Sequence, residues 1–399
     1  MGTNNLLGQP FVVNKLQLKN RLVASATYEC MATDDGKVTK DLHKRYQKLA
    51  QGGAGLIIPG YAFIEKNGQA LPRQIGISSD DHLSGLEELV QTMHEHGAKA
   101  VLQLAHAGRQ TLPDLIGGAT PMAPSAIEAD PLFNVQPREM TVGEIRQTID
   151  AFGEAASRAR KAGFDGVMIH ATHGYLVAQF LSPHTNRRID EWGGNTENRM
   201  RFLAEVYKTI RQAVGNDYPV LTKLSVEEGL PNGIHIEEAT KYAKRLSELG
   251  IDAIELSGGT VVDTVFLMSR GNIPIDVLTM GKDETVKPLI EEALFSIKDA
   301  VKYEEAYWLG AADEIKGVIG RTPLILVGGM KYPQTMEKIV KEGKADLISL
   351  CRSLIKEPDF PNEILAGRKS PSTCAFCNLC LAAVILMKPV GCYNRGLSS

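Results

Sequence analysis

Eight short apolar segments recur along the chain, and amphipathic stretches separate them. The segments are RLVASA (21–26), AGLIIPG (54–60), KAVLQLA (99–105), DGVMIHA (165–171), PVLTKLS (219–225), DAIELSG (252–258), PLILVGG (323–329) and ADLISLC (345–351). Each is a continuous apolar run rather than an alternating one, which is typical of parallel strands buried on both faces. Stretches with helical periodicity lie between them, including 80–97, 141–162, 196–215, 235–249 and 333–343.

Eight strand–helix units without a break in composition predict an α/β fold, a single (β/α)8 TIM barrel. A doubly wound sheet is the competing architecture, but the glycine-rich turn that it needs after its first strand is absent from the sequence. Three connections are longer than a minimal barrel requires, at 106–140, 174–195 and 259–320, and the last contains a helical piece around 288–304. In a barrel these connections lie on the C-terminal face, where active sites are built.

Composition and charge narrow the range of functions. The chain has 399 residues, 43% of them apolar and 23% charged, with a formal net charge of −3 and no basic run. This composition is typical of a globular protein, and the absence of a basic run argues against nucleic-acid binding. The longest apolar run, around LAAVILM (381–387), is far shorter than the roughly 20 residues of a membrane span. The N-terminus has neither the positively charged region nor the apolar region of a secretory signal, so we expect a cytoplasmic protein.

Polar residues interrupt or follow several of the predicted strands. Gln103 and Lys223 lie inside apolar strands and need partners, because an unpaired buried polar group is costly. Gln103 could belong to a polar layer inside the barrel or bind a ligand. Lys223 could bind a ligand or pair with the carboxylate of Glu255. Glycines and a cationic residue follow strands seven and eight, where barrels commonly bind phosphate: Gly328, Gly329, Met330, Cys351 and Arg352.

The segment HATHGY at the end of strand four carries the sharpest chemical signal. His170 and His173 are three residues apart, so both can point into one pocket and donate hydrogen bonds to one substrate oxygen. Tyr175 follows and is placed to donate a proton. A metal site and a place in the core are the alternatives for the histidines, and no third metal ligand is evident nearby.

Four longer stretches resemble the landmarks of the Old Yellow Enzyme family of flavin-dependent oxidoreductases. They are LKNRLVASA (18–26), LQLAHAGRQ (102–110), HATHGYLVAQFLSPHTNRRIDEWGGNTENRMRF (170–202) and ISLCRSLIKEPDFPNEI (348–364), in the family's order. The resemblance covers nearly the whole chain and implies a barrel that binds FMN on its C-terminal rim. It assigns the flavin ring to Ala26, Thr27, Gly60, Gln103 and Lys223, and the ribityl and phosphate groups to Ser257, Gly329, Met330, Cys351 and Arg352.

The same resemblance implies a reaction. NAD(P)H reduces FMN in a ping-pong cycle, and an α,β-unsaturated carbonyl compound then takes hydride at its β-carbon. His170 and His173 would bind the substrate oxygen, and Tyr175 would protonate the α-carbon. Two positions depart from the family pattern, because Pro is usual at Ala26 and Thr or Cys is frequent at Tyr28. Tyr28 is therefore expected to change the flavin potential or the substrate range.

Four of the six cysteines lie close together near the end of the chain, at Cys374, Cys377, Cys380 and Cys392. Their spacing resembles the [4Fe-4S] motif of one branch of the family, which includes 2,4-dienoyl-CoA reductase and trimethylamine dehydrogenase. Four thiolates are the ligands that such a cluster needs. On spacing alone, a zinc site of four cysteines is an alternative, and cysteines that bind no metal are a third possibility. The expected organisation is an FMN-binding barrel at 1–370 and a cysteine-rich extension at 371–399 packed on it, without the dinucleotide-binding domain of that branch.

Two function hypotheses from different classes follow. The leading one is an NAD(P)H-dependent flavin oxidoreductase that acts on a small unsaturated carbonyl compound. The alternative is an FMN and iron–sulfur subunit that relays electrons to or from a partner protein. A non-flavin barrel enzyme for sugar phosphates is a third reading. The oligomeric state stays open, with Arg109 a candidate contact to a neighbouring copy.

Overall fold

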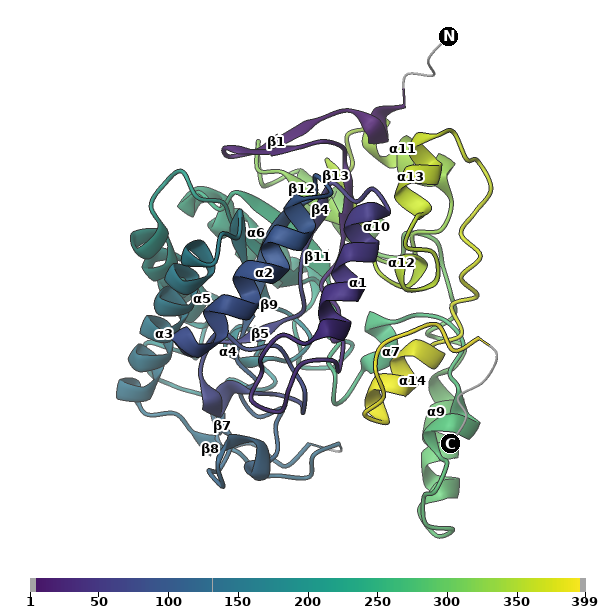
Figure 1. Ribbon diagram of the computed structural model, residues 1–399. Helices are drawn as coiled ribbons and strands as arrows, with labels where there is room; N and C mark the ends of the chain where they lie inside the picture. Colours follow the sequence, from purple (N-terminus) through teal and green to yellow (C-terminus); the bar gives the residue numbers. More distant parts are fainter. Residues whose placement is uncertain (1–4, 131, 395–399) are drawn as a thin grey trace.

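The predicted barrel is present in the computed structural model, which describes residues 5–130 and 132–394 (Figure 1). Strand pairing closes on itself, since β3 pairs in parallel with both β13 and β4, and β4 pairs with β6. The strands of the closed barrel are, in order, β3 (Leu22–Ala24), β4 (Leu56–Ile57), β6 (Lys99–Ala105), β9 (Gly166–Ala171), β10 (Val220–Ser225), β11 (Ala253–Ser257), β12 (Leu324–Leu326) and β13 (Leu347–Leu350). All eight lie within the apolar runs of the sequence, which confirms the predicted fold class.

Amphipathic helices surround the barrel. They are α1 (Lys40–Gln51), α2 (Leu83–His94), α3 (Val142–Lys161), α5 (Thr196–Val214), α6 (Ile236–Leu249), α10 (Leu309–Lys316), α11 (Pro333–Lys341), α12 (Arg352–Lys356) and α13 (Phe360–Leu365). Local signals fix where they begin: Thr141 and Glu144 form a reciprocal capping box at α3, and Asn195 accepts from the Asn198 amide at α5. Helices such as α2, α3 and α5 pack against the strands and bury an apolar face, as their sequence period predicts.

The inside of the barrel is packed, and one of its ends is closed. Side chains such as Val23, Val101, Met168 and Leu221 fill the interior, and residues of the N-terminal hairpin join the same apolar cluster. That hairpin consists of β1 (Phe11–Val13) and β2 (Leu16–Leu18), paired antiparallel. Since the cluster includes hairpin residues and the strand ends near them, a ligand site belongs at the opposite, C-terminal end.

The long connections carry the remaining elements. These are β5 (Ala62–Phe63), β7 (Met122–Ala123), β8 (Arg138–Glu139), α4 (Leu176–Leu181), α7 (Val265–Met268), α8 (Ile275–Leu278), α9 (Lys287–Ile297), α14 (Leu379–Ile385) and the 3₁₀ turns η1 (Leu6–Gly8), η2 (Lys66–Gly68), η3 (Asp80–His82) and η4 (Pro113–Ile116). The helical piece expected around 288–304 is α9, which ends earlier, at Ile297. In Figure 1, α9 projects from the body of the molecule.

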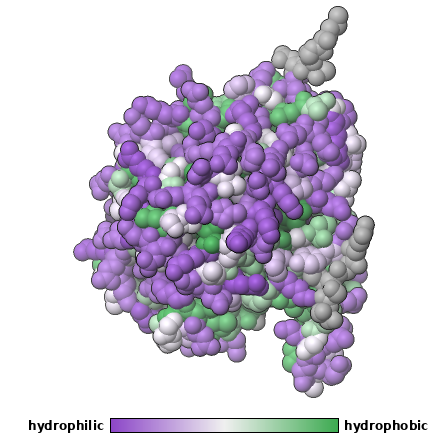
Figure 2. All heavy atoms as spheres, viewed as in Figure 1, coloured by the Kyte–Doolittle hydropathy of each residue, from purple (hydrophilic) through white to green (hydrophobic). Residues whose placement is uncertain are grey.

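The surface view in Figure 2 is mainly hydrophilic, with scattered apolar patches. Within the described residues, no helix is long and apolar enough to cross a membrane.

Candidate active site at the C-terminal end of the barrel

The three residues of the HATHGY segment converge after β9. The ring centroids of His170 and His173 are 5.2 Å apart, and those of His170 and Tyr175 are 5.0 Å apart. A left-handed turn produces this convergence, because His173 has φ +61° and Gly174 has φ +75°. The His173 ring nitrogen Nε2 lies 2.8 Å from the Ser257 hydroxyl at the end of β11. Nδ1 of the buried His170 has no hydrogen-bond partner in the part of the chain that the structure describes.

Burial sets the protonation of this group. It lowers the pKa of His170 and His173 well below the ordinary histidine value, and the positive charge of Lys223 adds to the effect. Both imidazoles are therefore neutral at neutral pH. Burial also raises the pKa of Tyr175, so its phenol stays protonated. Neutral imidazole donors beside a protonated phenol can polarise one substrate oxygen and supply one proton.

Tyr61 belongs to the same group, although no pattern in the sequence singles it out. Its hydroxyl lies 2.8 Å from the Tyr175 hydroxyl, and its ring centroid lies 4.9 Å from that of Tyr175. Tyr61 follows Gly60 directly, just past the end of β4. Its position near the end of a predicted strand was the only sign in the sequence that Tyr61 belongs to the site, because nothing links it to Tyr175, more than a hundred positions away.

A buried charge network lies below this group, inside the barrel. Lys223 Nζ donates to Ser25 Oγ at 2.8 Å and lies 3.4 Å from Glu255 Oε2, so the pairing with Glu255, one of the two interpretations of Lys223, is present. The other carboxylate oxygen of Glu255 accepts from Ser25 at 3.0 Å and from Ser349 at 2.7 Å. Neighbouring strands bring these side chains together, because Lys223 and Glu255 are register partners in β10 and β11.

Several polar groups at the C-terminal end are left for a ligand. Among the described residues, the amide nitrogen of the buried Gln103 donates only to the thioether of Met168, at 3.3 Å, which is a weak acceptor. In residues 5–130 and 132–394, the backbone N–H groups of Gly329, Met330 and Arg352 donate no hydrogen bond. Unsatisfied donors at the ends of β12 and β13 suit phosphate oxygens, and the amide of Gln103 and the ammonium group of Lys223 suit a ring with polar edges. These residues fit FMN.

The remaining predicted cofactor residues lie at the same end of the barrel. Thr27 Oγ1 lies 3.5 Å from Cys351 Sγ, so the ends of strands one and eight meet. Ala26 is partly buried, and Gly60 is buried with its amide donating to Glu29 and to the Tyr46 hydroxyl. The hydroxyl of Ser257 contacts His173, as described above.

The loop before β12 covers one side of the Gly328–Gly329 turn. Tyr303 donates its hydroxyl to the Gly329 carbonyl at 3.0 Å, and the Tyr307 ring lies against Gly328. A Cβ at Gly329 would overlap the carbonyl oxygen of Glu304, so this position requires glycine both for space and for its φ of +68°. The long connection 259–320 thus contributes directly to the site, as its place after strand six predicts.

The four clustered cysteines line one small cavity of about 20 Å³. Arg352, Phe376 and Asn378 line the same cavity, so the cysteines lie next to the end of β13. Burial raises the pKa of Cys374 and raises that of Cys380 to about 12. Among the described residues, no three or more His, Cys, Asp or Glu side chains are placed so that they could hold a metal ion. The cysteines share a cavity, but as placed they do not form a ligand set.

Arg109, the candidate contact to a neighbouring copy, is buried in its own chain. Its guanidinium donates to Asp263 at 2.8 Å, which joins the connection after β6 to the connection after β11.

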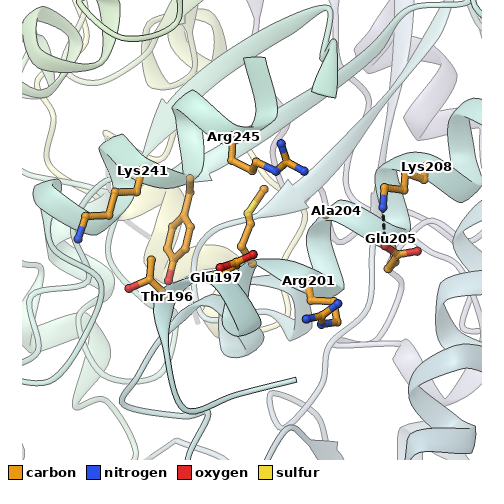
Figure 3. A pocket seen from close by; sticks show the side chains of 10 residues that line it. Thr196, Glu197, Arg201, Ala204, Glu205, Lys208, Lys241 and Arg245 are labelled. Atoms are coloured by element: carbon orange, nitrogen blue, oxygen red, sulfur yellow. Dashed lines mark hydrogen bonds and ion pairs between the residues drawn. The ribbon is translucent and has the colours of Figure 1, made fainter. Parts of the chain in front are cut away.

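A second cavity, of about 550 Å³, lies outside the barrel between α5 and α6 (Figure 3). Met200, Ala204 and Tyr242 are buried in its lining, and charged side chains such as Arg201 and Lys241 lie around them. It contains none of the predicted site residues.

A closed parallel barrel that gathers polar side chains at its C-terminal end is typical of barrel enzymes, which bind their ligands at that end. The chain belongs to the NADH:flavin oxidoreductase / NADH oxidase family, whose model matches residues 6–307. This membership confirms the resemblance noted in the sequence and the predicted class of enzyme. The family's cofactors, FMN and a nicotinamide nucleotide, are those that the sequence predicted.

Individual relatives agree with the family match. The chain is 35% identical over 369 residues to the NADH oxidase of Thermoanaerobacter brockii, covering 92% of this chain and 52% of that protein. It is 36% identical over 360 residues to the NADPH dehydrogenase of Geobacillus sp. WCH70, covering 89% and 92%. The Old Yellow Enzyme homologue of Zymomonas mobilis superposes with a TM-score of 0.71 at 26% identity, covering 93% and 96%. The chain thus spans about half the length of the Thermoanaerobacter relative and nearly all of the Geobacillus one.

Proposed function

We propose that this protein uses NAD(P)H and FMN to reduce the C=C bond of α,β-unsaturated carbonyl compounds. The observation that carries the proposal is the convergence of neutral His170 and His173 with protonated Tyr175 above the buried Lys223. A pair of neutral donors next to an acid is the arrangement that activates a carbonyl and protonates the carbon beside it.

Residues of this chain would hold the cofactor and orient the substrate. Gln103 and Lys223 would contact the flavin ring with Ala26, Thr27 and Gly60, and the other contacts would come from Ser257, Gly329, Met330, Cys351 and Arg352. Bound FMN would supply hydride transfer, accepting hydride from NAD(P)H and passing it to the β-carbon in ping-pong order. His170 and His173 donate hydrogen bonds to the carbonyl oxygen, which draws charge toward that oxygen. Tyr175 then gives its phenolic proton to the α-carbon.

The test compares a site variant with a matched surface variant. His170→Ala with His173→Ala should keep FMN but lose the turnover of 2-cyclohexenone with NAD(P)H, together with the long-wavelength absorbance that a bound phenol induces on flavin. His43 lies in α1 and His96 in the turn after α2, both outside the group of predicted site residues, so His43→Ala with His96→Ala should keep both signals. Unchanged phenol absorbance and turnover in the site variant would refute the proposed role, as would a wild-type protein without enone turnover.

The second candidate is a subunit that relays electrons between FMN, an iron–sulfur cluster and a partner protein. The shared cavity of Cys374, Cys377, Cys380 and Cys392 favours it. In this reading the barrel at 1–370 holds FMN, and the extension at 371–399 is a separate metal-binding element packed on it. As placed, the thiols do not form a ligand set, so binding would require the extension to close around the metal.

Metal analysis distinguishes the possibilities for the cysteines. Iron, acid-labile sulfide and zinc are measured per FMN on protein purified without oxygen. About four iron and four sulfide, the content of a [4Fe-4S] centre, would support the relay. Zinc alone would indicate a structural clip, and no metal would indicate free thiols. Either of the last two results would exclude the relay without affecting enone reduction.

A further inference from the structure

Tyr61 lies within the candidate active site but has no role in the reaction proposed above. It follows β4 through Gly60 and is only 7% exposed. Its ring centroid lies 4.9 Å from that of Tyr175 and 5.6 Å from that of His170. Tyr61 is therefore packed against the acid and against one of the two carbonyl-binding histidines at once.

The two tyrosine hydroxyls are bonded to each other and to nothing else in the described chain. The Tyr175 hydroxyl donates to the Tyr61 hydroxyl at 2.8 Å. Within residues 5–130 and 132–394, neither hydroxyl has a second protein partner. By contrast, the hydroxyl of neighbouring Tyr28 donates to the Pro72 carbonyl at 2.5 Å and takes no part in the pair. Because the buried Tyr61 hydroxyl bonds to the proposed acid Tyr175, we expect Tyr61 to affect the reaction through Tyr175.

We propose that Tyr61 is a positioning residue for Tyr175. It fixes the direction of the Tyr175 hydroxyl before reaction and donates a hydrogen bond to the Tyr175 phenolate that remains after the proton has left. The inference rests on the proposed function, since it requires that Tyr175 gives a proton to substrate.

The step balances within the named groups. The O–H bond of Tyr175 breaks, and a C–H bond forms at the α-carbon from the electron pair of the substrate enolate. The electrons of the broken O–H bond stay on Tyr175 as a phenolate. A hydroxyl hydrogen rotates freely about its C–O bond, so Tyr61 can turn from acceptor to donor without moving its ring. A proton from solvent later restores the Tyr175 hydroxyl.

The electrostatics of the pair support this direction. Burial raises the pKa of Tyr175, and the hydrogen bond between its hydroxyl and that of Tyr61 opposes this by lowering it. Burial, followed by the neighbouring Tyr175, raises the pKa of Tyr61 well above its ordinary value. Tyr61 therefore keeps its own proton and remains a donor. Without it, Tyr175 would be a weaker acid in a buried site.

The central experiment uses Tyr61→Phe, which keeps the ring and removes only the hydroxyl. In stopped-flow measurements on the FMN-loaded protein, reoxidation by 2-cyclohexenone should slow by roughly tenfold, the effect of losing one hydrogen bond to a developing charge. The solvent isotope effect of that half-reaction in D2O should increase, while reduction by NAD(P)H stays unchanged. Tyr207→Phe is the matched control, because the Tyr207 hydroxyl donates to the Gly250 carbonyl at 2.7 Å on the outer helical layer. It should alter neither half-reaction.

A double-mutant cycle decides whether Tyr61 acts through Tyr175. In a Tyr175→Phe background, Tyr61→Phe should cause no further slowing, because the acid is already gone. The same additional loss in both backgrounds would overturn the proposal and assign Tyr61 to packing, and so would unchanged reoxidation in the single variant. These results are distinguishable from a failure of the proposed function, in which wild-type protein itself would not be reoxidised by the enone.

Discussion

The Arg352 guanidinium donates a hydrogen bond to the side-chain oxygen of Asn378 at 2.7 Å. Arg352 begins the helix after β13, whereas Asn378 belongs to the CAFCNLC segment of the extension. The same guanidinium donates to the Arg270 carbonyl at 2.8 Å and lies 4.5 Å from the ring centre of Phe376. One cationic side chain thus connects the predicted phosphate site with the cysteine-rich segment.

Replacing Asn378 should therefore weaken FMN binding. In Asn378→Ala the guanidinium of Arg352 loses a buried acceptor, and the loop after β11 loses the two bonds that Asn378 donates to Ser269 and Asn272. We expect FMN affinity to fall about tenfold, the effect of roughly one charge-assisted hydrogen bond. Quenching of FMN fluorescence on titration with apoprotein measures it. Asn232→Ala, at an exposed position, is the control. Equal affinity in the two variants would contradict the link between the extension and the cofactor site.

Gly329→Ala should impair both stability and cofactor binding. The added methyl group would overlap the Glu304 carbonyl oxygen at a backbone φ of +68°. Gly320→Ala is a matched control, since Gly320 has φ +58° but nothing within 4 Å of an added Cβ. The control isolates the left-handed strain, which costs on the order of 1 to 3 kcal/mol. Thermal unfolding should show a larger loss for Gly329→Ala, with FMN binding lost in that variant alone. Equal melting temperatures of the Gly329→Ala and Gly320→Ala variants would show that the loop 303–308 moves to make room for the methyl group.

The fold, and the gathering of several candidate residues at one end of the barrel, could be predicted from the sequence for a specific physical reason. Parallel barrel strands are buried on both faces, so they appear as continuous apolar runs, and a polar residue in or after such a run stands out. This is why Gln103, Lys223 and His170 could be found. The pairing of Lys223 with Glu255 was also accessible, because both interrupt apolar strands that are neighbours in chain order.

Other features could not be predicted, because they depend on the paths of loops. Tyr61 meets Tyr175 only when the connection after β4 folds over the end of the barrel. The bond between Arg352 and Asn378 depends on how the extension returns to β13. Loop paths follow from many weak contacts and leave no periodic signal in the sequence.

The buried histidines should make the protein sensitive to acid. Burial lowers the pKa of His170 and His173 in the folded protein, whereas the unfolded chain takes up protons near pH 6.5. Their contribution to stability is complete above about pH 6.5 and is lost as the pH falls below that value, by up to about 1.4 kcal/mol per pH unit for each histidine. His170→Asn should therefore flatten the dependence of melting temperature on pH between about pH 7 and 5. The same slope in wild type and variant would mean that other groups dominate the acid transition.

Glu255→Gln should raise the reduction potential of bound FMN. Glu255 is fully buried, accepts from Ser25 and Ser349, and lies 3.4 Å from the ammonium group of Lys223, so its negative charge compensates that cation. Glutamine keeps the size and an acceptor oxygen but removes the charge, leaving Lys223 to favour the negative charge of reduced flavin. A rise of roughly 30 mV corresponds to about 1.4 kcal/mol for a two-electron couple. Loss of the buried pair should also lower the melting temperature. Ser349→Ala, which leaves the carboxylate charged, is the control and should shift the potential less. A potential that stays constant or falls in Glu255→Gln would show that Lys223 does not act on the flavin charge.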